Sequence, residues 1–69
     1  MGDPRLASRL KEYRTAAGLT QAELAERAGV SRKTVNTVEN GVFVPSTILA
    51  LSLARALGTT VEELFWLAE

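Results

Sequence analysis

Four glycines divide this chain of 69 residues into segments that are short for anything but single helices. They are Gly18, Gly29, Gly41 and Gly58. Gly is the residue that most often follows the end of a helix. Between the glycines the apolar residues recur at helical spacing, and no strand pattern appears. The sequence therefore predicts an all-α fold of five helices, over about residues 4–17, 21–28, 32–40, 47–57 and 61–65.

The expected helix starts carry side chains that are suited to capping. Asp3 stands before Pro4, and Pro is favoured in the first turn of a helix. Thr20 precedes Glu23 by three residues, which is the spacing of a capping box. Ser31 is the expected N-cap of the third helix. Because so few residues separate the second and third helices, we expect the chain to turn sharply and the two helices to cross closely.

The composition limits the classes of function. The chain contains no Cys and no His, which argues against a disulfide framework and the usual zinc clusters. No apolar run approaches the roughly 20 residues that cross a bilayer. No acidic cluster with a nucleophile and no Gly-rich phosphate loop indicates an enzyme. We therefore expect a single domain over residues 1–69, with no catalytic residues, no metal, no cofactor and no membrane partner.

The net charge is zero, but the charges are unevenly distributed along the chain. Residues 1–36 contain seven Lys or Arg and four acids, a net charge of +3, whereas residues 37–69 have a net charge of −3. A positive half could contact phosphate in an otherwise neutral protein.

The third predicted helix has two distinct faces. At about 100° per residue, Val35 and Val38 share one face. The opposite face has hydrogen-bonding side chains: Arg32, Lys33, Asn36, Thr37 and Asn40. Arg and Lys donate to guanine, Asn pairs with adenine, and Thr offers a hydroxyl and a methyl group. This face is suited to reading duplex DNA, and the alternative is the ordinary solvated face of a bundle helix.

A resemblance to a known family begins at Leu19. Residues 19–41 read LTQAELAERAGVSRKTVNTVENG and resemble the helix-turn-helix of the XRE family, also called phage-repressor-like or Cro-like. Every fixed position of the family pattern L-T-Q-x-x-L-A-x-x-x-G-V-S-x-x-x-[IV]-x-x-[IVLW]-E-x-G is matched. The flanking segments LKEYRTAAG and PSTILALSLARALGTTVEELF are similar to the family's first, fourth and fifth helices. The resemblance implies a minimal five-helix member without a sensor domain, whose helix-turn-helix spans about residues 20–40.

The resemblance also implies which residues contact DNA. In this family the first helix of the motif crosses the DNA backbone and the second lies in the major groove. Carried over position by position, the base-reading residues are Arg32, Lys33, Asn36 and Thr37. The residues implied to contact phosphate are Gln21, Asn40 and the backbone of Gly41. Gln21 stands at a helix N-terminus, where free amides and a partial positive charge favour an anion.

Two further residues, Arg14 and Glu39, are implied to form an ion pair. Without the resemblance, both would be read as charged residues of a solvated surface. In the family the pair is partly buried and ties the recognition helix to the rest of the domain. Glu39 is therefore expected to position the helix and not to contact DNA.

The loop that follows Gly41 departs from the family pattern. Many members have Lys and a polar residue around an aromatic there, and these contact phosphate. This chain has Val42, Phe43 and Val44 instead. Because Val42 removes an expected contact with the DNA backbone, we expect a single copy to bind DNA weakly.

Apolar residues that are not needed for the core indicate an interface between two chains. Trp66 and Leu67 follow the last expected core residues. Val44 and Ile48 form a second candidate patch, which could instead fold over the core. Exposed aromatic and apolar groups on a small domain are typical of an interface. We therefore expect a homodimer, because dimers of this motif read half-sites about one DNA turn apart.

Together these features predict a sequence-specific regulator that binds double-stranded DNA in the cytoplasm and represses transcription by occupying an operator. The alternative is an antitoxin-like or adaptor module, which binds a protein partner through its apolar surface and DNA only secondarily. We do not expect an enzyme. A chain with one core also leaves little room for a small-molecule effector.

Overall fold

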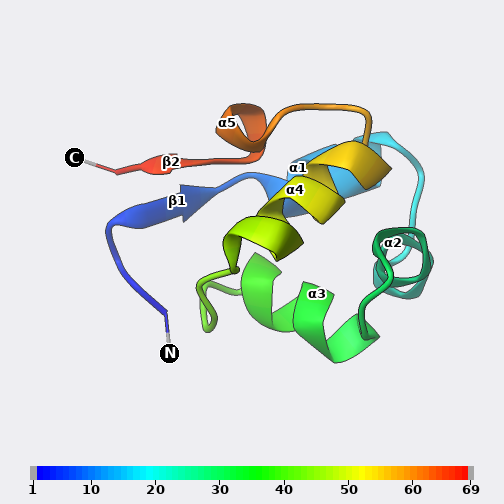
Figure 1. The fold of residues 1–69 in the computed structure, drawn as a ribbon, viewed down its shortest axis with the longest axis horizontal. Coiled ribbons are helices and arrows are strands. Elements are labelled where there is room, and N and C mark those ends of the chain that lie inside the picture. The colour runs from blue at the N-terminus through cyan, green and yellow to red at the C-terminus, as the bar shows by residue number, and fades with distance from the viewer. Residues whose placement is uncertain (1, 69) are drawn as a thin grey trace.

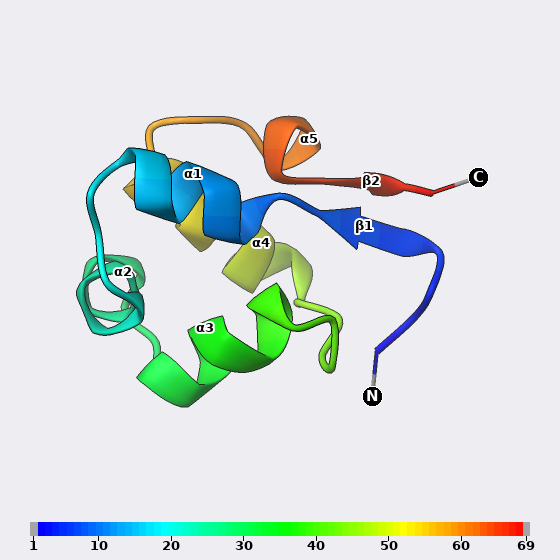
Figure 2. The same ribbon diagram turned by 180° about the vertical axis from the view of Figure 1, so that it is seen from behind.

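The computed structural model describes residues 2–68, which form five short helices and a two-stranded sheet (Figure 1). In chain order the elements are β1 (Leu6–Ser8), α1 (Leu10–Ala16), α2 (Gln21–Ala28), α3 (Arg32–Glu39), α4 (Thr47–Ala56), α5 (Val61–Leu64) and β2 (Phe65–Leu67). Helix α2 lies at one end of the longest axis, the sheet lies at the other end, and α3 runs along one side (Figures 1 and 2). Within residues 2–68, no helix has the length and apolar character that crossing a membrane requires.

The predicted helices from α2 to α5 are confirmed, and so are the predicted caps of α2 and α3. The Thr20 hydroxyl accepts the backbone N–H of Glu23 at 3.0 Å, and the Glu23 carboxylate accepts that of Thr20 at 2.9 Å, which completes the capping box. Ser31 accepts the backbone N–H of Thr34 at 3.1 Å and so caps α3. These bonds satisfy N–H groups that a helix start leaves free.

The prediction for the first segment is wrong at its start. We expected a helix from Pro4, but α1 begins at Leu10, and residues 6–8 form a strand. This strand pairs with β2 in antiparallel register; the partners are Leu6 and Leu67, Ala7 and Trp66, and Ser8 and Phe65. The fold of the described residues is therefore mostly helical with a small sheet, not purely all-α.

Hydrogen bonds of the first residues explain this difference. The Asp3 carboxylate accepts the backbone N–H of Arg5 at 2.9 Å, so it closes a turn and does not cap α1. The backbone N–H of Arg9 donates to the carbonyl of Leu64 at 2.9 Å. Backbone N–H and C=O groups that are not part of a helix need other hydrogen-bond partners. Here the partners lie at the far end of the chain, where no local sequence pattern reveals them.

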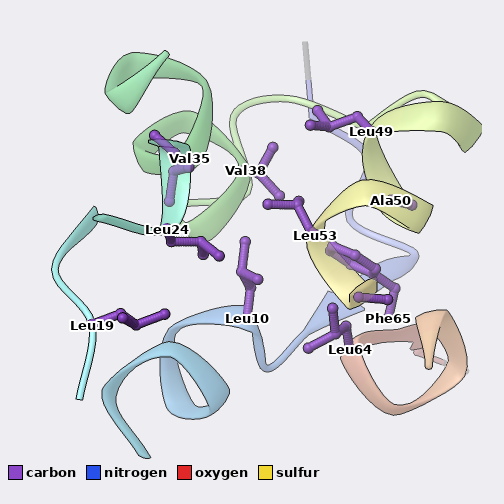
Figure 3. Close-up of a cluster of buried hydrophobic side chains, with 12 residues drawn as sticks. Leu10, Leu19, Leu24, Val35, Val38, Leu49, Ala50, Leu53, Leu64 and Phe65 are labelled. Atoms are coloured by element: carbon purple, nitrogen blue, oxygen red, sulfur yellow. The ribbon is translucent and has the colours of Figure 1, made fainter. Parts of the chain in front are cut away.

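Every helix contributes a fully buried side chain to one hydrophobic core (Figure 3). These side chains are Leu10, Leu24, Val35, Leu53 and Leu64. Each contributes about 1.5–3 kcal/mol by leaving water. Helix α3 buries only Val35 and Val38 in this core, and its opposite face is not part of the core.

Candidate nucleic-acid interface

Helices α2 and α3 form a helix-turn-helix with a short, well-defined turn. Gly29 has a φ of +73°, a left-handed conformation that Gly adopts readily. The backbone N–H of Val30 then donates to the carbonyl of Ala25 at 2.9 Å and closes the turn. In the described part of the chain no other element covers the outer side of α3 (Figures 1 and 2).

Three of the four expected base readers lie on this outer side. Arg32, Lys33 and Asn36 are exposed. Together with Gln21 they line an open cleft of about 320 Å³ at the junction of α2 and α3. The crossing of the two helices therefore brings an expected phosphate contact and three expected base readers to one place.

Thr37, the fourth expected base reader, differs from the others. It is half-buried, and its hydroxyl donates to the carbonyl of Thr34 at 3.0 Å. Because this proton is used within α3, Thr37 can offer a ligand its methyl group and an oxygen lone pair, but no donor.

The expected phosphate contact Gln21 belongs to a chain of polar side chains. Its Nε2 donates to Oε1 of Glu39 at 3.0 Å, and its Oε1 accepts from Nδ2 of Asn36 at 3.4 Å. Nδ2 of Asn40 donates in turn to Oδ1 of Asn36 at 3.3 Å. The backbone N–H of Gly41 is donated to the carbonyl of Val38 at 3.2 Å. The Asn40 amide has a second N–H group, so at this end of α3 it can donate to a ligand more readily than the backbone of Gly41.

Arg14 and Glu39 form an ion pair beneath the polar chain. Arg14 Nε lies 2.5 Å from Oε2 of Glu39, and Nη2 lies 3.2 Å from Oε1. The two side chains are 11% and 2% exposed, and Arg14 Nη1 also donates to the carbonyl of Leu19 at 2.8 Å. The hydrogen bond with Glu39 raises the pKa of Arg14. The one acid of α3 is thus paired and buried, and the exposed face keeps two cations.

Comparison with known proteins identifies this arrangement. The model of the helix-turn-helix family matches residues 10–64. The chain belongs to the XRE type of helix-turn-helix transcriptional regulators.

Relatives and solved structures agree with this assignment. An uncharacterized regulator of helix-turn-helix type from Methanothermobacter thermautotrophicus is 51% identical over 61 residues, which cover 87% of this chain and 88% of the relative. The structure of the restriction-modification controller protein C.AhdI from Aeromonas hydrophila is 44% identical, with a TM-score of 0.77, over 80% of this chain and 83% of that one. The structure of SinR, the master regulator for biofilm formation, in complex with DNA is 31% identical and has a TM-score of 0.74. The match covers 78% of this chain and 87% of that one.

The loop after α3 of this XRE-type domain holds two residues whose position the sequence reading missed. Val42 and Phe43 line a cleft of about 290 Å³ together with Lys33, Thr34 and Thr37. The only signal in the sequence is a Gly followed by apolar residues where the family is polar. That signal says that the loop is unusual, but not that it folds back onto α3.

The apolar residues expected at an interface are all exposed in this XRE-type domain. The exposed fraction of the residue is 78% for Ile48, 66% for Leu67, 42% for Val44 and 40% for Trp66. Val44 and Ile48 therefore do not fold over the core. The loop before α4 lies on the side of α3, whereas strand β2 lies on the side of α5 (Figures 1 and 2), so the two patches are separate.

Proposed function

We propose that this XRE-type protein is a sequence-specific regulator that binds double-stranded DNA as a homodimer in the cytoplasm and represses transcription by occupying its operator. The observation that carries the proposal is the outer face of α3. Arg32, Lys33 and Asn36 are exposed there, while the carboxylate of Glu39 is buried in an ion pair. Such a face offers donors to base edges and exposes no acid that would repel phosphate.

In this proposal α3 lies in the major groove and its side chains read the bases. Arg32 donates to guanine O6 and N7, Lys33 donates to an acceptor on a base edge, and Asn36 pairs with adenine. Each good bidentate contact of this kind discriminates against a wrong base by about 1–3 kcal/mol. Thr37 contributes an apolar contact, since its hydroxyl proton is used within α3.

Phosphate contacts set the register of the domain on the duplex without carrying sequence information. We assign them to Gln21 at the start of α2 and to Asn40 with the adjoining Gly41 backbone at the end of α3. The free amides at the N-terminus of α2 add a partial positive charge beside Gln21. The hydrogen bond from Gln21 to Glu39 supports this role, because it holds the amide at the edge of the recognition face.

A homodimer follows from the small size of the interface that one domain offers to DNA. Pairing two copies makes the second half-site intramolecular and raises the affinity without new contacts. Trp66 and Leu67 are exposed, as are Val44 and Ile48, and these apolar residues support pairing. The expected operator has two inverted half-sites about one DNA turn, roughly 34 Å, apart.

In vitro selection from a pool of random duplexes tests the proposal. We expect an inverted repeat that binds much more tightly than random duplex of the same length and salt concentration. If the selected duplexes bind no better than random ones, the proposal is wrong. The alternative of an adaptor module with secondary DNA binding then gains support.

A further inference from the structure

The cleft between α3 and the loop that follows it has a chemistry of its own. It is lined by Lys33, Thr34, Thr37, Val42 and Phe43. The loop extends toward the same side of the molecule as α3 (Figures 1 and 2). Lys33 and Thr37 are candidate base readers, so the cleft continues the proposed DNA-binding face.

The walls of this cleft offer methyl groups and hardly any hydrogen-bond donors. The Thr37 hydroxyl donates to the carbonyl of Thr34 at 3.0 Å, and the Thr34 hydroxyl shares a hydrogen bond of 2.9 Å with Ser31. Both hydroxyls are thus engaged within the protein. Val42 and Phe43 remain 57% and 42% exposed. The Lys33 ammonium is the charged donor among the lining side chains.

The position of Val42 beside α3 is held by backbone hydrogen bonds. Gly41 has a φ of +70°, which allows the chain to reverse at the end of the helix. The backbone N–H of Val42 donates to the carbonyl of Thr37 at 2.9 Å. The cleft is therefore formed before any ligand binds. When an apolar group enters it, the protein loses little conformational entropy.

We propose that this cleft receives the C5-methyl group of one thymine in each half-site, with Lys33 donating to O4 of the same base. The inference rests on the proposed function. Thymine is the base that presents a methyl group beside an acceptor in the major groove. Cytosine would turn its N4 donor toward the Lys33 ammonium and would leave the apolar walls uncovered. Val42 and Phe43 thus add specificity for the methyl group of a base whose O4 accepts from Lys33.

Deoxyuridine tests the proposal, because it differs from thymidine only by the missing methyl group and keeps O4. In the duplex obtained by selection, each thymidine is replaced in turn, symmetrically in both half-sites. We expect one position at which the replacement lowers the affinity for a half-site about fourfold, the effect of one buried methyl group. The other positions should change little.

Two matched variants assign the effect to the cleft. Val42→Thr keeps the size of the side chain and replaces a methyl with a hydroxyl. Val44→Thr makes the same change at an exposed valine outside the cleft. The measured quantity is the ratio of affinities of each variant for the thymidine and deoxyuridine forms of a duplex with a single half-site, so that pairing of two copies does not enter the ratio. We expect a ratio near one for Val42→Thr and the wild-type ratio for Val44→Thr.

The outcomes separate this inference from the proposed function. A selected duplex that is preferred over random DNA, but has no methyl-sensitive thymine, overturns the inference and leaves the regulator intact. A methyl-sensitive position whose ratio persists in Val42→Thr also overturns the inference. The absence of any preferred duplex overturns both.

Discussion

Gln21 at the start of α2 and Asn36 in the middle of α3 are joined by a hydrogen bond of 3.4 Å from Asn36 Nδ2 to Gln21 Oε1. Gln21 also donates to Glu39 at 3.0 Å. One amide thus contacts a candidate base reader and the buried ion pair, and it stands where a phosphate contact is proposed. We therefore expect phosphate binding and base reading to be coupled in this protein.

Gln21→Ala should weaken binding to every duplex, because a phosphate contact carries no sequence information. The loss should be somewhat larger for the selected duplex, because Asn36 also loses its hydrogen bond to Gln21. Asn36→Ala should act mainly on the selected duplex. If the hydrogen bond couples the two residues, the double variant loses less binding free energy than the two single variants together. Fluorescence anisotropy with selected and random duplexes measures these losses. A Gln21→Ala loss confined to one operator position would contradict the phosphate role.

Lys33→Ala should weaken binding to the selected duplex by about 1–3 kcal/mol and change binding to random duplex far less. Lys11→Ala, at an exposed lysine of α1, is the control for losing one positive charge. It should affect both duplexes slightly and equally. Equal losses on both duplexes for Lys33→Ala would show that Lys33 does not read bases.

Arg14→Met should destabilise the domain by about 3–5 kcal/mol, because it leaves the nearly inaccessible Glu39 carboxylate without its partner. Arg5→Met is the matched control, since Arg5 pairs with Asp3 at 2.8 Å but is 79% exposed. It should leave the melting temperature almost unchanged. Thermal melts followed by circular dichroism compare the two. Similar small shifts in both variants would mean that the buried pair does not anchor α3.

The Asp3 carboxyl should titrate far below an ordinary aspartate. Hydrogen bonds from the side chain and then from the backbone of Arg5 lower its pKa from 3.8 to about 2. Because the folded pKa is the lower one, any stabilisation from this turn is complete above about pH 4 and is lost as the pH falls toward 2. NMR of the carboxyl carbon should show the pKa rising toward 3.8 in Arg5→Met and not in Arg9→Met. An unchanged pKa in Arg5→Met would contradict the contact.

Trp66→Glu should give a folded monomer that binds a half-site and a full site almost equally. A charge placed on β2 would be buried against the second copy, while the helices keep their core. Leu51→Glu, at an exposed leucine of α4 outside the four interface residues, should remain a dimer. Sedimentation at tens of micromolar distinguishes the two. A single 7.4 kDa species for the unmodified protein would exclude the proposed homodimer under these conditions.

The helices from α2 to α5, and the exposure of several site residues, could be predicted from the sequence. Capping signals such as Thr20 with Glu23 act within one turn of chain, so they can be read locally. The period of Val35 and Val38 likewise assigns one face of α3 to the core and the other to solvent. Family resemblance added the expectation of an Arg14–Glu39 pair, which no local pattern contains.

The remaining features could not be predicted, because each depends on a contact between segments that are distant in the sequence or that meet where the chain reverses. Residues 6–8 form a strand because their partners are residues 65–67, a pairing that neither segment signals alone. Gln21 meets Asn36 because α2 and α3 cross, and Val42 lies beside Thr37 because Gly41 reverses the chain. Local propensity reports the conformation of a few neighbouring residues, whereas these contacts arise from packing of the whole core, which selects among locally permitted conformations.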